Sequence, residues 1–343
     1  MGVKSLARKL AAGTIGGLGL APALGRLTGG RAAILAYHRV LDPAQDDLDL
    51  VEPGMFVTRE TFADHCDYLA AHCRVVKLST LLRQLLTGEK IAHGTVALTF
   101  DDGWLDNFEN ALPVLRNRDL PATIFVPTGL VDTRHRFWFS RAAAAAAGMW
   151  QRRESLIRAF PDQRMPAAAK FLMTLLVEQP KRPRFVQAAL AACKNVSPET
   201  REAVVAFMEE LAEEKLPPRR ELVTWDELRQ MRQGGFEVGS HTVNHVILTE
   251  GDSSTARAEL ELSRRQIVEQ LGAASPVFCY PNGDHNAALR QLVARTGYAG
   301  ALTTAAGFAD RQPDLFALPR LGVHQGVAPS ANGLALLLTG LGI

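Results

Sequence analysis

Residues 96–103 read Val-Ala-Leu-Thr-Phe-Asp-Asp-Gly, an apolar run that ends in two adjacent acids and a glycine. Such a run is typical of a buried strand, with Asp101 and Asp102 in the loop at its C-terminal end. On both sides of it, apolar runs alternate with amphipathic helical patterns. Further strands are predicted at residues 32–37, 74–78, 122–126, 236–240, 277–280, 300–303 and 318–323, and helices at 59–71, 79–86, 108–118, 225–233, 256–271 and 287–295. This alternation predicts an α/β fold whose parallel sheet is covered by helices and is either open or closed into a barrel.

A second polar stretch follows the predicted strand 236–240, where residues 241–245 read His-Thr-Val-Asn-His. Both α/β architectures collect ligands at the C-terminal ends of their strands, so His241 and His245 are expected near Asp101 and Asp102. A carboxylate and two imidazoles suit a hydrolytic Zn²⁺ or a similar divalent ion such as Co²⁺, Ni²⁺ or Fe²⁺. The remaining carboxylate offers a general base.

The alternation pauses at about residues 134–222, where helical segments separated by prolines predict a helical insertion. Charge is uneven along the chain, although the net charge is only +2. Residues 1–31 carry five Lys/Arg and no acid, residues 134–220 carry sixteen basic and nine acidic side chains, and the rest carries 17 basic and 27 acidic. We expect no nucleic-acid partner. Peripheral membrane contact through residues 1–31 or through the basic insertion is a possible consequence of this pattern.

The segment 1–31 is basic and then apolar but rich in glycine, so it is a tail, a membrane-peripheral helix or a weak signal peptide. The sequence contains no run of 18 or more apolar residues, so no membrane-spanning helix is predicted. The four cysteines, Cys66, Cys73, Cys193 and Cys279, form no CxxC pair and are expected to be reduced. A cytoplasmic or inner-membrane-peripheral location is therefore favoured over an exported one.

The chain resembles the polysaccharide deacetylase family, the NodB-homology enzymes of carbohydrate esterase family 4. The family motif T-F-D-D-G stands at residues 99–103 and H-[ST]-x-x-H at 241–245. Flanking blocks at 36–40, 107–113, 120–123 and 278–283 agree as well, and the likeness runs from about residue 32 to 325. The Tyr-His and Tyr-Pro-x-Gly blocks are nearest to the branch that includes biofilm poly-N-acetylglucosamine deacetylases. The resemblance implies a catalytic domain over residues 32–343 that folds as a deformed (β/α) barrel of about seven strands. It also implies a bound metal ion, usually Zn²⁺, and removal of N-acetyl groups from a GlcNAc-containing glycan.

The resemblance also implies roles for individual residues. Asp101 would be the general base, and Asp102, His241 and His245 would hold the metal. The third motif supplies an oxyanion N–H, here from Asn282 in Tyr280-Pro281-Asn282, whereas its arginine is absent.

Three further assignments remain open. The general acid is either His38, which follows the first strand, or His324 near the C-terminus. Arg320 is a candidate ion-pair partner of Asp101, and Trp104 a candidate platform for a sugar ring.

Other functions fit the same residues. One is an amidohydrolase that acts on a small ring amide, which the missing arginine of the third motif leaves open, and a close variant is an O-acetyl sugar esterase. A protein from another class, a non-catalytic glycan-binding protein, is disfavoured by the intact Asp101, Asp102, His241 and His245.

Overall fold

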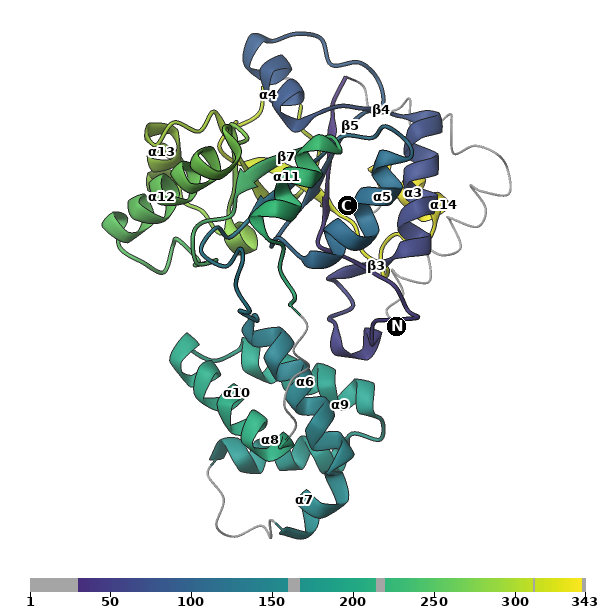
Figure 1. Cartoon of the computed structure of the whole chain (residues 1–343), viewed down its shortest axis with the longest axis vertical. Coiled ribbons are helices and arrows are strands. Elements are labelled where there is room, and N and C mark those ends of the chain that lie inside the picture. The colour runs from purple at the N-terminus through teal and green to yellow at the C-terminus, as the bar shows by residue number, and fades with distance from the viewer. Residues whose placement is uncertain (1–29, 160–166, 214–219, 311, 341–343) are drawn as a thin grey trace. The chain divides into compact units, whose positions relative to one another are not determined.

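The computed structural model describes residues 30–159, 167–213, 220–310 and 312–340 (Figure 1). The expected N-terminal segment, apart from its last two residues, lies outside the described residues. The chain divides into two compact units. One comprises Met1–Asp42, Pro53–Arg134 and Arg220–Ile343, and the other Pro43–Glu52 and His135–Arg219.

The first unit is built on a closed barrel of seven parallel strands, as predicted. The barrel strands are β1 (Ala33–Tyr37), β5 (Thr95–Phe100), β6 (Ala122–Val126), β7 (Phe236–Ser240), β8 (Val277–Cys279), β9 (Gly300–Ala306) and β10 (Leu318–Gly322). They are hydrogen-bonded in the order β1-β10-β9-β8-β7-β6-β5. Parallel pairing of β1 with β5 closes the ring, with Ala33 opposite Val96 and Tyr37 opposite Phe100.

Three short strands lie outside the ring. The strand β4 (Arg74–Val75) adds to the start of β5, and β2 (Arg39–Leu41) pairs only with β3 (Phe56–Thr58). The helices of this unit are α3 (Arg59–His72), α4 (Leu78–Thr87), α5 (Leu112–Arg116), α11 (Trp225–Gln233), α12 (Ser253–Leu271), α13 (Ala287–Arg295) and α14 (Ala331–Leu338).

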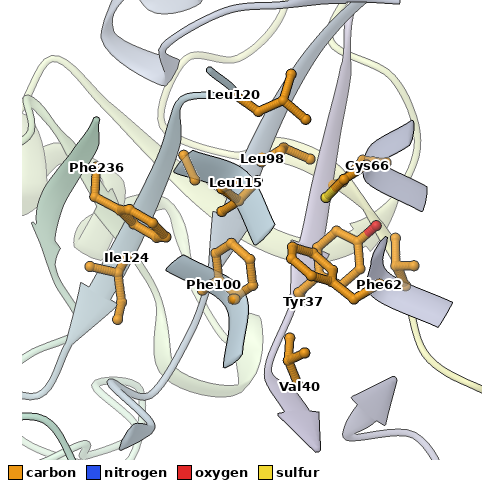
Figure 2. Packing of buried hydrophobic residues seen from close by; sticks show 14 of the residues in the cluster. Tyr37, Val40, Phe62, Cys66, Leu98, Phe100, Leu115, Leu120, Ile124 and Phe236 are labelled. Atoms are coloured by element: carbon orange, nitrogen blue, oxygen red, sulfur yellow. The ribbon is translucent and has the colours of Figure 1, made fainter. Parts of the chain in front are cut away.

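The barrel strands are buried on both faces because alternate residues enter two different cores. Tyr37 of β1 and Phe100 of β5 belong to the outer core, where they pack with Phe62 of α3 (Figure 2). The Tyr37 ring stacks on Phe100 with centroids 5.5 Å apart and meets Phe62 edge-on at 5.3 Å. Such aromatic contacts add to the burial energy that holds the helices on the barrel.

The opposite face of the strands fills the barrel interior. Ile34, Phe125 and Leu302 pack there with Leu81 of α4 in one apolar cluster. A Cβ atom at Gly239 would lie 2.5 Å from the Phe125 ring, so this glycine makes the room that the ring needs. The helix predicted over residues 79–86 was expected to have Ser79 as its N-cap, and this is wrong because Ser79 lies inside α4. The helix begins at Leu78, and the Ser79 N–H and hydroxyl donate to the Glu237 carboxylate of β7.

The second unit is helical. It contains α6 (Trp138–Gln151), α7 (Arg153–Ala159), α8 (Ala167–Glu178), α9 (Arg182–Lys194) and α10 (Pro198–Ala212), with the short 3₁₀ turn Leu48–Leu50. These helices share their own apolar core. No helix in the described part of the chain has the length and hydropathy needed to cross a membrane. The four cysteines are free, as predicted.

Candidate active site and metal centre

The candidate residues meet at one end of the barrel because parallel strands present all their C-terminal ends there. Asp101 and Asp102 follow β5, and the segment from His241 to His245 follows β7. The third-motif residues follow β8, while His38 and His324 follow β1 and β10.

Asp102 faces the two histidines. Its Oδ1 lies 3.4 Å from Nε2 of His241 and 3.2 Å from Nε2 of His245. These three side chains offer ligand atoms within 4.8 Å of one another. Asp102 adopts φ +73°, a left-handed conformation that aspartate tolerates better than most residues. The two adjacent carboxylates therefore point to different partners.

The two imidazoles and the carboxylate fit a divalent ion chemically. Nδ1 of His241 lies 2.8 Å from the Cys279 carbonyl oxygen. Because a carbonyl only accepts, Nδ1 must carry a proton, so Nε2 is the nitrogen that would bind a metal, with loss of any proton that it donates to Asp102. Burial acts to raise the pKa of Asp102, but hydrogen bonds from His241 and His245 outweigh it and hold that pKa well below its usual value. The carboxylate is therefore ionised, as a ligand must be.

A buried acid holds the loop that carries the histidines. The Glu259 carboxylate of α12 accepts the backbone N–H groups of Val243 at 2.6 Å and Asn244 at 3.0 Å, and the Asn244 side-chain amide at 2.7 Å. The loop needs this support because His245 adopts φ +56°. Sequence reasoning missed Glu259. The available signal was an acid three residues after Ala256, on the same core-facing side of the helix.

Asp101 is paired with Arg320. The guanidinium donates to both carboxylate oxygens, at 2.9 and 2.6 Å, and also to the Thr303 carbonyl at 2.8 Å and the Thr99 hydroxyl at 3.2 Å. Both charged side chains are buried. Burial acts to raise the pKa of Asp101, but the charge and hydrogen bonds of Arg320 outweigh it and lower that pKa. The ion pair considered from the sequence is present.

The two general-acid candidates differ in position. Nε2 of His38 lies 3.9 Å from Oδ2 of Asp101, and the Asn107 amide holds the His38 carbonyl at 2.8 Å. His324 lies on the loop after β10, where its Nδ1 accepts the Gly326 N–H at 3.2 Å. The geometry favours His38, and both roles stay predictions.

Two of the third-motif assignments are corrected. The N–H of Tyr280 donates to Leu302, its hydroxyl donates to Phe316, and its ring is buried, so it offers nothing to a substrate. Pro281 is buried and has no N–H. Asn282 is exposed, with φ +58°, and its role as an oxyanion donor stays a prediction.

The prediction of Trp104 as a sugar platform is wrong. Its ring is 0% exposed, the Arg39 guanidinium lies 4.3 Å from the ring centroid, and the Trp104 backbone pairs with Leu222. Its Nε1–H donates instead to Oδ2 of Asp102 at 3.0 Å. No local sequence signal distinguishes this buried tryptophan from an exposed one, since Arg39 and Leu222 lie far from it in the sequence.

Comparisons with known proteins agree with this site. A family model described as Polysaccharide deacetylase matches residues 89–301. The Bacillus subtilis protein YxkH, whose assignment as a polysaccharide deacetylase is provisional, is 28% identical over 111 residues, which are 32% of this chain and 40% of that protein. The match therefore spans about two fifths of the length of this curated relative.

Three solved structures share the fold. The Streptococcus pyogenes deacetylase PplD, in complex with acetate, has a TM-score of 0.58 and 19% identity, covering 90% of this chain and 98% of that one. IcaB from Ammonifex degensii has a TM-score of 0.56 and 18% identity, and the match covers 91% of this chain and 98% of that one. BC0361, a polysaccharide deacetylase from Bacillus cereus, has a TM-score of 0.55 and 16% identity, and the match covers 90% of this chain and 69% of that one.

The family model covers more than half of the chain, and its range contains both of the motifs whose side chains meet at the barrel end. The protein belongs to the polysaccharide deacetylase family.

Proposed function

We propose that the protein is a metal-dependent hydrolase that removes N-acetyl groups from a GlcNAc-containing poly- or oligosaccharide. One observation carries the proposal: Asp101 and Asp102, adjacent in the chain, are divided between a buried arginine and a pair of imidazoles. A carboxylate kept ionised beside a metal-ligand triad is the pairing that metal-assisted hydrolysis of an amide requires.

Asp102, His241 and His245 would hold the ion, and Zn²⁺ suits two nitrogen ligands and one oxygen ligand with positions left open. The bound ion supplies Lewis acidity, which polarises the acetamide carbonyl and lowers the pKa of water. The side chains of His38 and His245 are 26% and 25% exposed, so the otherwise buried site meets solvent beside these two rings.

Asp101 takes up the proton of the attacking water. Arg320 lowers the pKa of Asp101, so Asp101 is ionised before the reaction. A weak base of this kind accepts a proton only from water whose own pKa has been lowered. The bidentate contact also fixes the carboxylate plane, so the proton is taken at a defined place beside the triad.

His38 then protonates the leaving amine. Its ring reaches the Asp101 carboxylate at 3.9 Å and is partly exposed, which suits a group that meets both the reacting atoms and the substrate. The backbone N–H of Asn282 is the proposed donor to the developing oxyanion.

The test measures acetate release from N-acetylglucosamine oligomers and from O-acetylated sugars, and ring opening of small ring amides. The protein is stripped with a chelator, assayed, and assayed again after Zn²⁺ is restored. Zinc-restored acetate from the N-acetylglucosamine oligomers supports the proposal. Turnover of only the O-acetyl sugars or the ring amides would replace its substrate class, and glycan binding without turnover of any compound would refute catalysis.

A further inference from the structure

The two oxygens of the Asp102 carboxylate have different partners. Oδ1 faces Nε2 of His241 and of His245, at 3.4 and 3.2 Å. Oδ2 accepts the Nε1–H of Trp104 at 3.0 Å. A carboxylate can bind a metal through one oxygen or through both, so a fixed hydrogen bond to one of them affects how the ligand binds.

Trp104 is itself held rigidly. The Arg39 guanidinium lies over its ring, 4.3 Å from the centroid, and donates through Nε to Asp106 at 2.9 Å. The other Asp106 oxygen accepts the Val40 N–H at 2.7 Å, which ties this chain of contacts to β2. The indole is fully buried, so it has little room to turn away from Asp102.

We propose that Trp104 is a positioning residue for the metal ligand Asp102, because its N–H occupies Oδ2 and leaves Oδ1 as the single ligand oxygen. An indole N–H only donates, so it stabilises the ionised carboxylate and competes with no metal. It also restricts rotation of the carboxylate, which keeps Oδ1 aimed at the imidazoles before an ion arrives. This inference rests on the metal site of the proposed function.

A purely structural tryptophan would affect stability and leave metal affinity unchanged. The decisive variant is therefore Trp104→Phe, which keeps an aromatic ring and removes the donor. The matched control is Trp225→Phe, which removes an indole N–H at the start of α11 in the same unit, at a tryptophan packed on the outer core rather than on Asp102.

The experiment is competition for Zn²⁺ between each purified full-length protein and a chelator of known affinity. Loss of an outer-shell partner typically weakens metal binding about 10- to 100-fold, which is the fall expected for Trp104→Phe. Trp225→Phe should bind as the wild type does. The visible spectrum of the Co²⁺-loaded proteins gives a second readout, since a freed Oδ2 should alter the ligand field in Trp104→Phe alone.

Should Trp104→Phe fail to fold, benzothienylalanine at position 104 retains the shape of the indole and replaces N–H with sulfur. Reduced zinc affinity of this variant supports the inference. Wild-type zinc affinity and an unchanged Co²⁺ spectrum in a folded variant without the N–H would overturn it, while the metal site stands. A wild-type protein that binds no Zn²⁺ would overturn both the inference and the metal site of the proposed function.

Discussion

Substitution of Arg320 by methionine would leave the Asp101 carboxylate buried without its counter-charge. The side chains of the pair are 1% and 3% exposed, and the guanidinium donates to both carboxylate oxygens, at 2.9 and 2.6 Å. Removing one partner of a buried pair typically costs about 3–5 kcal/mol, because the remaining charge stays shielded from water and loses its main counter-charge. We therefore expect Arg320→Met to raise the unfolding constant by roughly a hundredfold to several-thousandfold.

The protein contains a matched control for this prediction. Arg118 donates to both carboxylate oxygens of Asp67 at 2.7 and 2.9 Å, nearly the same distances, but its partner is 66% exposed. Exposed pairs contribute about 0.2–1 kcal/mol, so Arg118→Met should cost no more than that. Both guanidinium groups donate two hydrogen bonds to their carboxylate, so a larger loss for Arg320→Met reflects the burial of its pair and of its contacts to Thr303 and Thr99.

Both variants are measured by urea unfolding against the wild type. The double variant Asp101→Asn/Arg320→Met should be less destabilised than the sum of the two single variants, since it leaves no unpaired charge. Equal losses for Arg320→Met and Arg118→Met, or strict additivity at positions 101 and 320, would refute the reasoning.

A Cβ atom at Gly283, where φ is +80°, would lie 2.5 Å from the Thr304 backbone nitrogen. Gly88 has a similar φ of +70°, but a Cβ atom there would meet no other atom within 4 Å. Gly283→Ala should therefore lower the melting temperature by more than Gly88→Ala, and equal shifts would contradict this. Glu259→Gln replaces one acceptor oxygen with a donor that faces the Asn244 side-chain amide, which should cost about 1–3 kcal/mol of stability and speed amide exchange at Val243 and Asn244. Glu261→Gln, at an exposed ion pair, should change neither the stability nor the exchange rates. Burial lowers the pKa of His65 to about 4, below its unfolded value of about 6.5, so only the unfolded chain gains the proton as the pH falls between these values. About 3 kcal/mol of stability should therefore be lost across this pH range. Urea unfolding of His65→Asn should show a smaller dependence of stability on pH than the wild type, and an equal dependence would contradict this.

The barrel was predictable because its strands are apolar runs with clear ends. Predicted and observed bounds agree closely at β5 and β6 and coincide at α11 and α13, where Thr224 and Asn286 cap the helices. The strands β2 and β3 escaped prediction because three residues show no periodicity. The helix α14 escaped because residues 331–338 are almost uniformly apolar, so no face stands out.

The candidate site was predictable where a motif carries chemistry within a few residues. Asp101, Asp102, His241 and His245 meet as expected, since each lies at a strand end. Trp104 and Glu259 were not predictable in their roles because their partners come from distant segments. Trp104 pairs with Leu222 through the backbone and lies beneath the Arg39 guanidinium, and the contact of Glu259 with the histidine loop depends on how α12 packs.

The central claim is that two adjacent carboxylates have separate roles. Zinc content and acetate release from N-acetylglucosamine oligomers should therefore be measured together on Asp101→Asn and Asp102→Asn. We predict that Asp101→Asn keeps its zinc and loses turnover by at least about 10²-fold, the usual contribution of a general base. Asp102→Asn should lose both. Wild-type turnover by zinc-loaded Asp101→Asn, or full zinc retention by Asp102→Asn, would contradict the account.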